Sequence, residues 1–281
     1  MEALSEILNK QNLTSSQPNV NEYEKDGLIY CSKCNTPKQT IINFMGKPKK
    51  VRCSCKCEAE EFERLQVEQI AREKQIQIES LKINSLLGKR YANASFETSD
   101  ISSDNFKRAL DRCKKYCEVA DEVLANGYGI YIYGNSGTGK THLTACMCNE
   151  LISQLRQCLF TNFFEISKSI RATFNSRSDT EERLIERISN VDFLFIDDIG
   201  TERLQNNGED TWLQEKIYDI INKRYNAKKP TIFTSNYNLN ELVAERGMLE
   251  KTAERVLEMS NAIIKLDGLS YRRRIKKDIP F

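Results

Sequence analysis

The eight residues Gly134-Asn-Ser-Gly-Thr-Gly-Lys-Thr141 decide the fold of most of this chain. They fit the pattern G-x-x-x-x-G-K-[ST] in full, after the apolar run 130–133 and before a stretch rich in Leu and Ala. A strand, a glycine-rich loop and a helix in this order predict that backbone N–H groups surround the phosphates of a nucleotide. The residues expected to bind ATP are Gly134, Asn135, Ser136, Gly137, Thr138, Gly139, Lys140 and Thr141. Lys140 is expected to reach the β- and γ-phosphates, and the Thr141 hydroxyl to hold Mg²⁺.

Short apolar segments alternate with helical patterns from about residue 91 onward. The expected strands are 129–133, 158–162, 191–197, 231–235 and 262–266. The expected helices are 140–155, 164–175, 181–189, 212–226 and 240–258. Apolar strands joined by helical crossovers predict an α/β fold, in which a parallel sheet is covered by helices on both faces.

Two carboxylates follow the apolar run 191–196 and predict the second half of the phosphate site. Asp197 and Asp198 stand at the carboxyl end of an expected strand, where ligands collect in open parallel sheets. We expect Asp197 to bind Mg²⁺ through water, and Asp198 to orient or deprotonate the attacking water. Asn236 follows another expected strand and is suited to contacting the γ-phosphate or that water.

Four motifs make the segment 91–281 resemble the AAA+ ATPases, and more narrowly their DnaC/DnaI/IstB branch. They are GNSGTGKTHL at 134–143, FIDDIGTE at 195–202, TSNYNLNEL at 234–242, and the segment 254–272 with its ERV and SYR triplets. The motifs occur in the order that the family has, so the resemblance implies an AAA+ fold and ATP hydrolysis. One departure is the second acidic residue, which is Asp where AAA+ proteins more often have Glu, and this branch tolerates it.

The resemblance also implies roles for three residues far along the chain from the phosphate loop. Asn236 looks like the sensor-1 residue, Arg272 like the sensor-2 arginine, and Arg255 like the finger supplied to a neighbouring subunit's ATP. An alternative for Arg255 is an ion pair on the helix surface with Glu254 or Glu258, an interaction that contributes little to stability.

Five cysteines near the N-terminus have the spacing of a metal site. Cys31-x-x-Cys34 is followed, after eighteen residues, by Cys53-x-Cys55-x-Cys57, which is close to a four-cysteine zinc ribbon. Four of the five are expected to bind Zn²⁺, and the spacing leaves open which of the last three does not. Seven Lys or Arg and no Asp or Glu lie between the first and last of them, and would offset the negative charge of a zinc tetrathiolate. Because this segment is short and polar, Zn²⁺ binding and folding are expected to be one event.

The chain is therefore expected to have four parts. They are an N-terminal helix and linker at 1–26, a zinc-binding module at 27–60, a helical connector at 61–90 and the AAA+ ATPase domain at 91–281. The connector has two opposed apolar stripes, which suit a helix gripped from both sides. A helix broken near 72–75 is the alternative.

The composition excludes several classes of function. The 42 basic and 40 acidic side chains of the 281 residues nearly cancel, so no global attraction to nucleic acid or membrane is expected. His142 is the only histidine, which excludes His-rich metal sites, and it is expected to pack within its helix. No signal-peptide pattern or membrane-spanning apolar stretch is found, so a cytoplasmic protein is expected, with its ten cysteines in a reducing compartment. Five of these, at 113, 117, 146, 148 and 158, are expected in the core.

DnaI-type helicase loaders, including those of phages, are similar in their order of zinc module, helical connector and AAA+ domain. The resemblance implies a loader of the replicative hexameric helicase, in which the N-terminal module contacts the helicase and AAA+ subunits assemble into an oligomer. An IstB-like transposition helper and a P-loop kinase with a zinc appendage are the alternatives. Single-stranded DNA is a partner implied by the family, with 271–277 and the pair Lys168 and Arg171 as candidate contacts; each could equally be a solvated surface.

Overall fold

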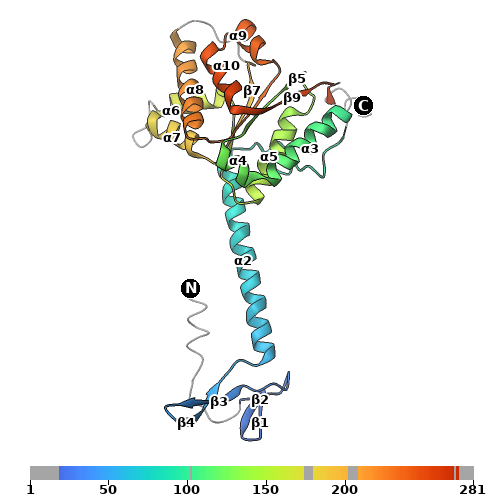
Figure 1. Ribbon diagram of the computed structural model, residues 1–281, viewed down its shortest axis with the longest axis vertical. Helices are drawn as coiled ribbons and strands as arrows, with labels where there is room; N and C mark the ends of the chain where they lie inside the picture. The colour runs from blue at the N-terminus through green and yellow to red at the C-terminus, as the bar shows by residue number, and fades with distance from the viewer. Residues whose placement is uncertain (1–18, 102, 174–179, 202–207, 269, 272–281) are drawn as a thin grey trace. The chain divides into compact units, whose positions relative to one another are not determined.

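The computed structural model describes residues 19–101, 103–173, 180–201, 208–268 and 270–271 (Figure 1). The chain divides after Gln75 into two compact units. The predicted N-terminal helix at 3–8 lies outside the described residues, as does Arg272.

The first unit is built from two antiparallel hairpins. Its strands are β1 (Glu22–Lys25), β2 (Leu28–Cys31), β3 (Gln39–Phe44) and β4 (Lys47–Arg52), with β1 paired to β2 and β3 to β4. The strand β1 lies within the segment that the sequence predicts to be a linker, so that interpretation is wrong for these residues. The Asp26-Gly27 pair forms the turn that lets β1 pair with β2, because both residues have the positive φ that a two-residue hairpin turn requires.

The helix α2 (Lys56–Asn84) begins among the last cysteines and runs without a break through 72–75, so the alternative of a broken helix is wrong. The boundary between the two units falls within it. Ile78 and Leu81 pack against the core of the second unit, together with Leu87, just beyond the helix. The other apolar side chains of the two stripes are 43–78% exposed; they are Phe62, Leu65, Val67, Ile70, Ile76 and Ile83.

The second unit is an α/β fold around a five-stranded sheet, as the sequence predicts (Figure 1). The strands are β5 (Gly129–Gly134), β6 (Cys158–Thr161), β7 (Phe193–Ile199), β8 (Thr231–Ser235) and β9 (Ser260–Leu266). They pair in the order β6-β7-β8-β5-β9, and every pair is parallel. All five predicted strands are confirmed to within two residues at either end.

Helices cover both faces of this sheet, because successive side chains of each strand point to opposite cores. Ile130 and Ile132 of β5 lie in one core and Tyr131 lies in the other. One core is covered by α3 (Asp104–Glu118), α4 (Ala120–Asn126) and α5 (Lys140–Ser153). The other is covered by α6 (Phe163–Thr173), α7 (Glu181–Asn190), α8 (Gly208–Asn226), α9 (Leu239–Arg246) and α10 (Glu250–Met259). The cysteines at 113, 117, 146, 148 and 158 are buried in the first core, as expected.

Two helix predictions need correction. The single helix expected at 240–258 is two helices. Gly247 ends α9 in the left-handed conformation, with φ of 74°, and α10 begins after Leu249. The helices α3 and α4 are not among the sequence predictions. A short 3₁₀ turn, Lys89–Tyr91, leads into this unit. None of the described helices combines the length and the apolar character that crossing a bilayer requires.

Candidate nucleotide site and cysteine cluster

The glycine-rich loop 134–139 joins β5 to α5 at the carboxyl edge of the sheet. A side chain at Gly134 would collide with the Leu266 carbonyl of β9, and one at Gly137 with the Ser270 side chain. The backbone of the loop therefore lies closer to its neighbours than any other residue type would allow. The predicted strand, loop and helix are all present, so the loop has the geometry of a phosphate-binding site.

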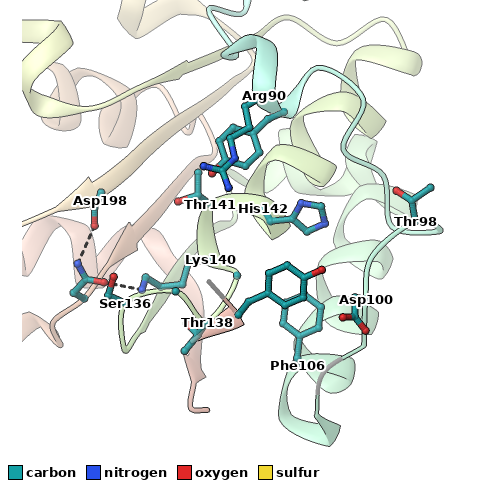
Figure 2. Close-up of a pocket in the computed structure, with 15 residues that line it drawn as sticks. Arg90, Thr98, Asp100, Phe106, Ser136, Thr138, Lys140, Thr141, His142 and Asp198 are labelled. Carbon is teal, nitrogen blue, oxygen red and sulfur yellow. Dashed lines mark hydrogen bonds between the residues drawn. The ribbon is translucent and has the colours of Figure 1, made fainter. Parts of the chain in front are cut away.

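The Lys140 ammonium group is held inside this loop by three oxygen atoms. Its Nζ donates to the carbonyls of Gly134 at 2.8 Å and Asn135 at 3.0 Å, and to Asn236 Oδ1 at 2.8 Å. The Asn236 amide nitrogen in turn donates to Asp198 Oδ1 at 3.1 Å (Figure 2). Direct hydrogen bonds thus join three predicted site residues, of which one begins α5 and two lie at the carboxyl ends of β7 and β8.

Thr141 and Asp197 also meet directly. The Thr141 hydroxyl lies 3.0 and 3.2 Å from the two Asp197 carboxylate oxygens, and the Thr234 hydroxyl donates to the same carboxylate at 2.6 Å. Burial raises the pKa of Asp197, so a cation at this point would stabilise its charged form. Hydroxyl and carboxylate oxygens are the ligands that Mg²⁺ prefers, so these side chains fit the ion.

Asp198 adopts a backbone conformation that few non-glycine residues adopt. Its φ is 56°, and its N–H donates to the Thr234 hydroxyl at 2.8 Å. Asp and Asn tolerate the left-handed region best, and such strain is often found at functional sites. This turn of the chain leaves Asp198 exposed beside Asn236, whereas Asp197 points into the sheet edge.

A cavity of about 300 Å³ opens over the phosphate loop (Figure 2). The wall of the cavity opposite the loop comes from residues within 90–100 and from Phe106 of α3, none of which the sequence motifs predict to belong to the site. The residues of this wall are Arg90, Tyr91, Thr98, Asp100 and Phe106. The volume of the cavity is at the lower end of the range of small-molecule sites.

His142 also lines this cavity, although the sequence predicts that it packs within its helix. Its Nε2 lies 3.0 Å from the Ser99 hydroxyl and 3.6 Å from Cys146 Sγ. Burial lowers the pKa of His142, which favours the neutral imidazole. The side chain therefore connects α5 to the opposite wall as well as packing within the helix.

The structure does not bring Arg255 to the cavity. Its half-buried guanidinium donates to Glu258 and lies 4.0 Å from the centre of the Tyr225 ring of α8. The surface ion pair considered from the sequence is therefore present within the chain, with Glu258 as the partner. Arg272 lies outside the described residues. The residue before it in the sequence, Tyr271, lines the cavity, and its N–H donates to the Gly137 carbonyl at 2.8 Å.

In the first unit, four cysteines gather and one stays apart. The sulfur atoms of Cys31, Cys34, Cys55 and Cys57 all lie within 4.8 Å of one another, whereas Cys53 Sγ lies 3.6 Å from the Pro37 carbonyl. Tetrahedral Zn–S bonds of about 2.3 Å would place sulfurs about 3.8 Å apart, so the four thiols fit a zinc ion.

Hydrogen bonds and burial shift the pKa values of these thiols in opposite directions. The Thr36 hydroxyl lowers the pKa of Cys34 to about 5, while burial raises the pKa of Cys55. Crowded thiolates repel one another, and a divalent cation would remove that repulsion. The cluster is therefore compatible with zinc in its geometry and in its chemistry.

Residues 63–278 match the sequence model of a family described as IstB-like ATP binding protein. The chain is 30% identical over 186 residues to the replicative helicase loader DnaC of Escherichia coli strain K12, which covers 66% of this chain and 71% of that protein. It is 29% identical over 195 residues to the replicative helicase loader DnaI of Bacillus subtilis strain 168, which covers 64% and 58%.

Solved structures share the fold. A crystal structure of the DnaC helicase loader superposes with a TM-score of 0.54 at 24% identity, over 64% of this chain and 100% of that one. A crystal structure of DnaI superposes with a TM-score of 0.52 at 22% identity, over 66% and 94%. These structural matches establish the architecture around the cavity.

Proposed function

Because this chain belongs to the IstB-like ATP binding protein family, we propose that it is an ATP-dependent loader of a replicative DNA helicase. The family binds ATP, and relatives at about 30% identity are named replicative helicase loaders. The observation that carries the proposal is the continuous contact from Lys140 through Asn236 to Asp198. This contact places a cation for the phosphates beside an amide and a carboxylate that can position the attacking water, which are groups that hydrolysis of a bound triphosphate uses.

The side chains of the site have distinct tasks in this proposal. Lys140 exchanges its two carbonyl partners for phosphate oxygens, and neutralises charge that develops on the phosphoryl group. Thr141 and Asp197 would hold Mg²⁺, which supplies further positive charge at the phosphates. Asp198 orients or deprotonates the attacking water, and Asn236 fixes the position of the Asp198 carboxylate.

In this proposal a second copy of the chain completes the nucleotide site by supplying an arginine. Arg255 would leave Glu258 and act on the neighbouring subunit's ATP, and Arg272 would act as the sensor-2 arginine. The exposure of Glu258, whose side chain is 51% exposed, supports this exchange, because such surface pairs contribute little to stability. Oligomerisation is therefore part of the proposed activity.

The cysteine cluster is proposed to bind one Zn²⁺ through Cys31, Cys34, Cys55 and Cys57, with Cys53 outside the ligand set. The module so stabilised would contact the hexameric helicase, while the AAA+ subunits place it on single-stranded DNA. Lys168 and Arg171 are exposed on α6 and are candidate contacts to that DNA. The names of the relatives favour a loader over a transposition helper or a small-molecule kinase.

Affinity capture with the full-length protein tests this function. We expect it to co-purify with the replicative helicase of its own organism, and to let that helicase unwind DNA coated with single-strand-binding protein. Lys140→Ala should lose this stimulation, whereas Lys223→Ala, which removes a half-exposed lysine of α8 paired with Asp219 one turn away, should keep it. Capture of a transposase in place of a helicase would support the transposition helper instead. ATP-dependent phosphorylation of a small acceptor, without either partner, would support the kinase.

A further inference from the structure

One face of the β3–β4 hairpin combines exposed apolar and cationic side chains. Residues directly opposite in a hairpin share a face, and the register pairs Ile42 with Lys49 and Phe44 with Lys47. Ile42 is 41% exposed and Phe44 is 54% exposed. Lys49 Nζ lies 5.5 Å from the centre of the Phe44 ring. We call these four residues the lysine–phenylalanine face.

Lys47 and Lys49 give this face positive charge, and the ion pairs made by other hairpin residues do not involve them. Lys38 binds Glu22 and Glu58, and Arg52 binds Glu22. Within the described parts of the chain, no ion pair joins Lys47 or Lys49 to a carboxylate. The sequence has no acidic residue between Cys31 and Cys57, so none is available nearby on the hairpin itself.

The tip of the hairpin carries a strained, exposed methionine. Met45 and Gly46 have φ of 51° and 78°, and Met45 is 89% exposed. The equivalent turn between β1 and β2 uses Asp26-Gly27, a pair that suits positive φ, whereas methionine does not. Because this side chain is almost fully exposed, an Asn or Asp would fit the turn better, and Met45 extends the exposed apolar surface of the face to the hairpin tip.

We propose that the lysine–phenylalanine face, with Met45 at its tip, binds single-stranded nucleic acid. Every base has a π-face that stacks on an exposed aromatic ring, and lysines on either side of the ring attract the adjacent phosphates. Lys47 and Lys49 lie two residues apart on one strand, so both ammonium groups face the same backbone. The inference does not depend on the ATPase or the helicase, because it concerns a different unit.

The test uses the full-length protein without nucleotide and a fluorescein-labelled oligodeoxythymidylate, followed by anisotropy over a range of salt concentrations. Phe44→Leu should weaken binding by about 5- to 100-fold, and Phe44→Trp should restore it, because stacking is lost and regained. The double variant Lys47→Gln/Lys49→Gln should reduce the magnitude of the slope of log K against log salt by about 1.4. The reason is that two phosphate contacts are lost, at about 0.7 each. Ile41→Ala is the matched control, because Ile41 is 56% exposed on the opposite face.

A further variant separates binding from folding. Met45→Asn should relieve the strained turn and raise the stability of the hairpin, yet weaken oligonucleotide binding. Photo-crosslinking to iododeoxyuridine should place adducts within 39–52. Wild-type affinity and salt slope in the Phe44 and lysine variants, with adducts only elsewhere, would overturn the proposal. The same result accompanied by loss of a captured protein would assign the face to a protein partner instead.

Discussion

The two units of the chain hold their polar groups in place by different means. In the second unit, a hydrophobic core on each face of the sheet fixes the strand ends beside Asp198 and Asn236 and the start of α5, which carries Lys140. In the first unit, the buried apolar residues among 19–75 are only Ile29, Cys31 and Cys55, and two of these are cysteines of the cluster. The nucleotide site therefore rests on a core that is complete without a ligand, while the cysteine cluster is itself most of the core.

Removing the metal should produce the largest effect, and it should be confined to one unit. Purified protein should contain one zinc per chain by elemental analysis, and Cys31→Ser should release it and unfold the hairpins. Zinc binding by small modules is worth about 10–16 kcal/mol, more than this unit could replace by burial. The matched variant Cys53→Ser should retain the metal. Unfolding of 76–281 on chelation, or an absence of zinc, would contradict the separation of the two units.

The second unit should lose turnover in an Arg255→Ala variant without losing its fold. An arginine finger is worth about 10³- to 10⁵-fold in turnover, so ATP should still bind while hydrolysis nearly stops. Mixing Arg255→Ala with Lys140→Ala should restore part of the activity, because mixed interfaces pair an intact loop with an intact finger. Glu258→Gln is the control, since it removes the ion pair and keeps the arginine. A mixture that co-assembles and stays inactive would exclude the role in trans.

The smallest expected effect is that of Asp198→Asn, which should lower turnover less than Arg255→Ala does, and neither it nor Lys140→Ala should affect folding. Asp198→Asn should keep ATP binding and lower turnover by about 10²- to 10⁴-fold, because only the activation of water is lost. Lys140→Ala should weaken ATP binding itself. Fluorescent-nucleotide titration separates the two variants, and a thermal melt checks the fold. Normal hydrolysis by either one would contradict the assignment of the site.

The sequence was most informative where one local pattern decides the structure. The strand β5 and its loop follow from an apolar run and a glycine motif, and the buried strands β7 and β8 from apolar runs alone. The helix α3 was also within reach, because its apolar residues 106, 109, 110, 113 and 117 recur at helical spacing behind the N-cap Ser103. The Asp26-Gly27 turn was a readable signal for the first hairpin.

Other features depend on contacts that no local pattern reports. The wall of the cavity from residues 90–100 comes from a segment of mixed polarity, which is held against α5 by the hydrogen bonds of Asn149 to Tyr91 and of His142 to Ser99. The spacing does not tell which cysteine stays outside the cluster; in the folded hairpin Cys53 Sγ lies beside the Pro37 carbonyl, away from the other four. The positive φ of Asp198 follows from its tie to Thr234 on the neighbouring strand.

The contact of Gly137 with the end of the described chain has a mechanical consequence. Its carbonyl accepts the Tyr271 N–H, and the space where its side chain would stand is filled by Ser270. The phosphate loop and residues 270–271 are therefore in direct contact, with no space left between Gly137 and the Ser270 side chain. A displacement of the loop when a nucleotide enters or leaves would therefore also displace Tyr271, so the occupancy of the phosphate site and the position of this residue are linked.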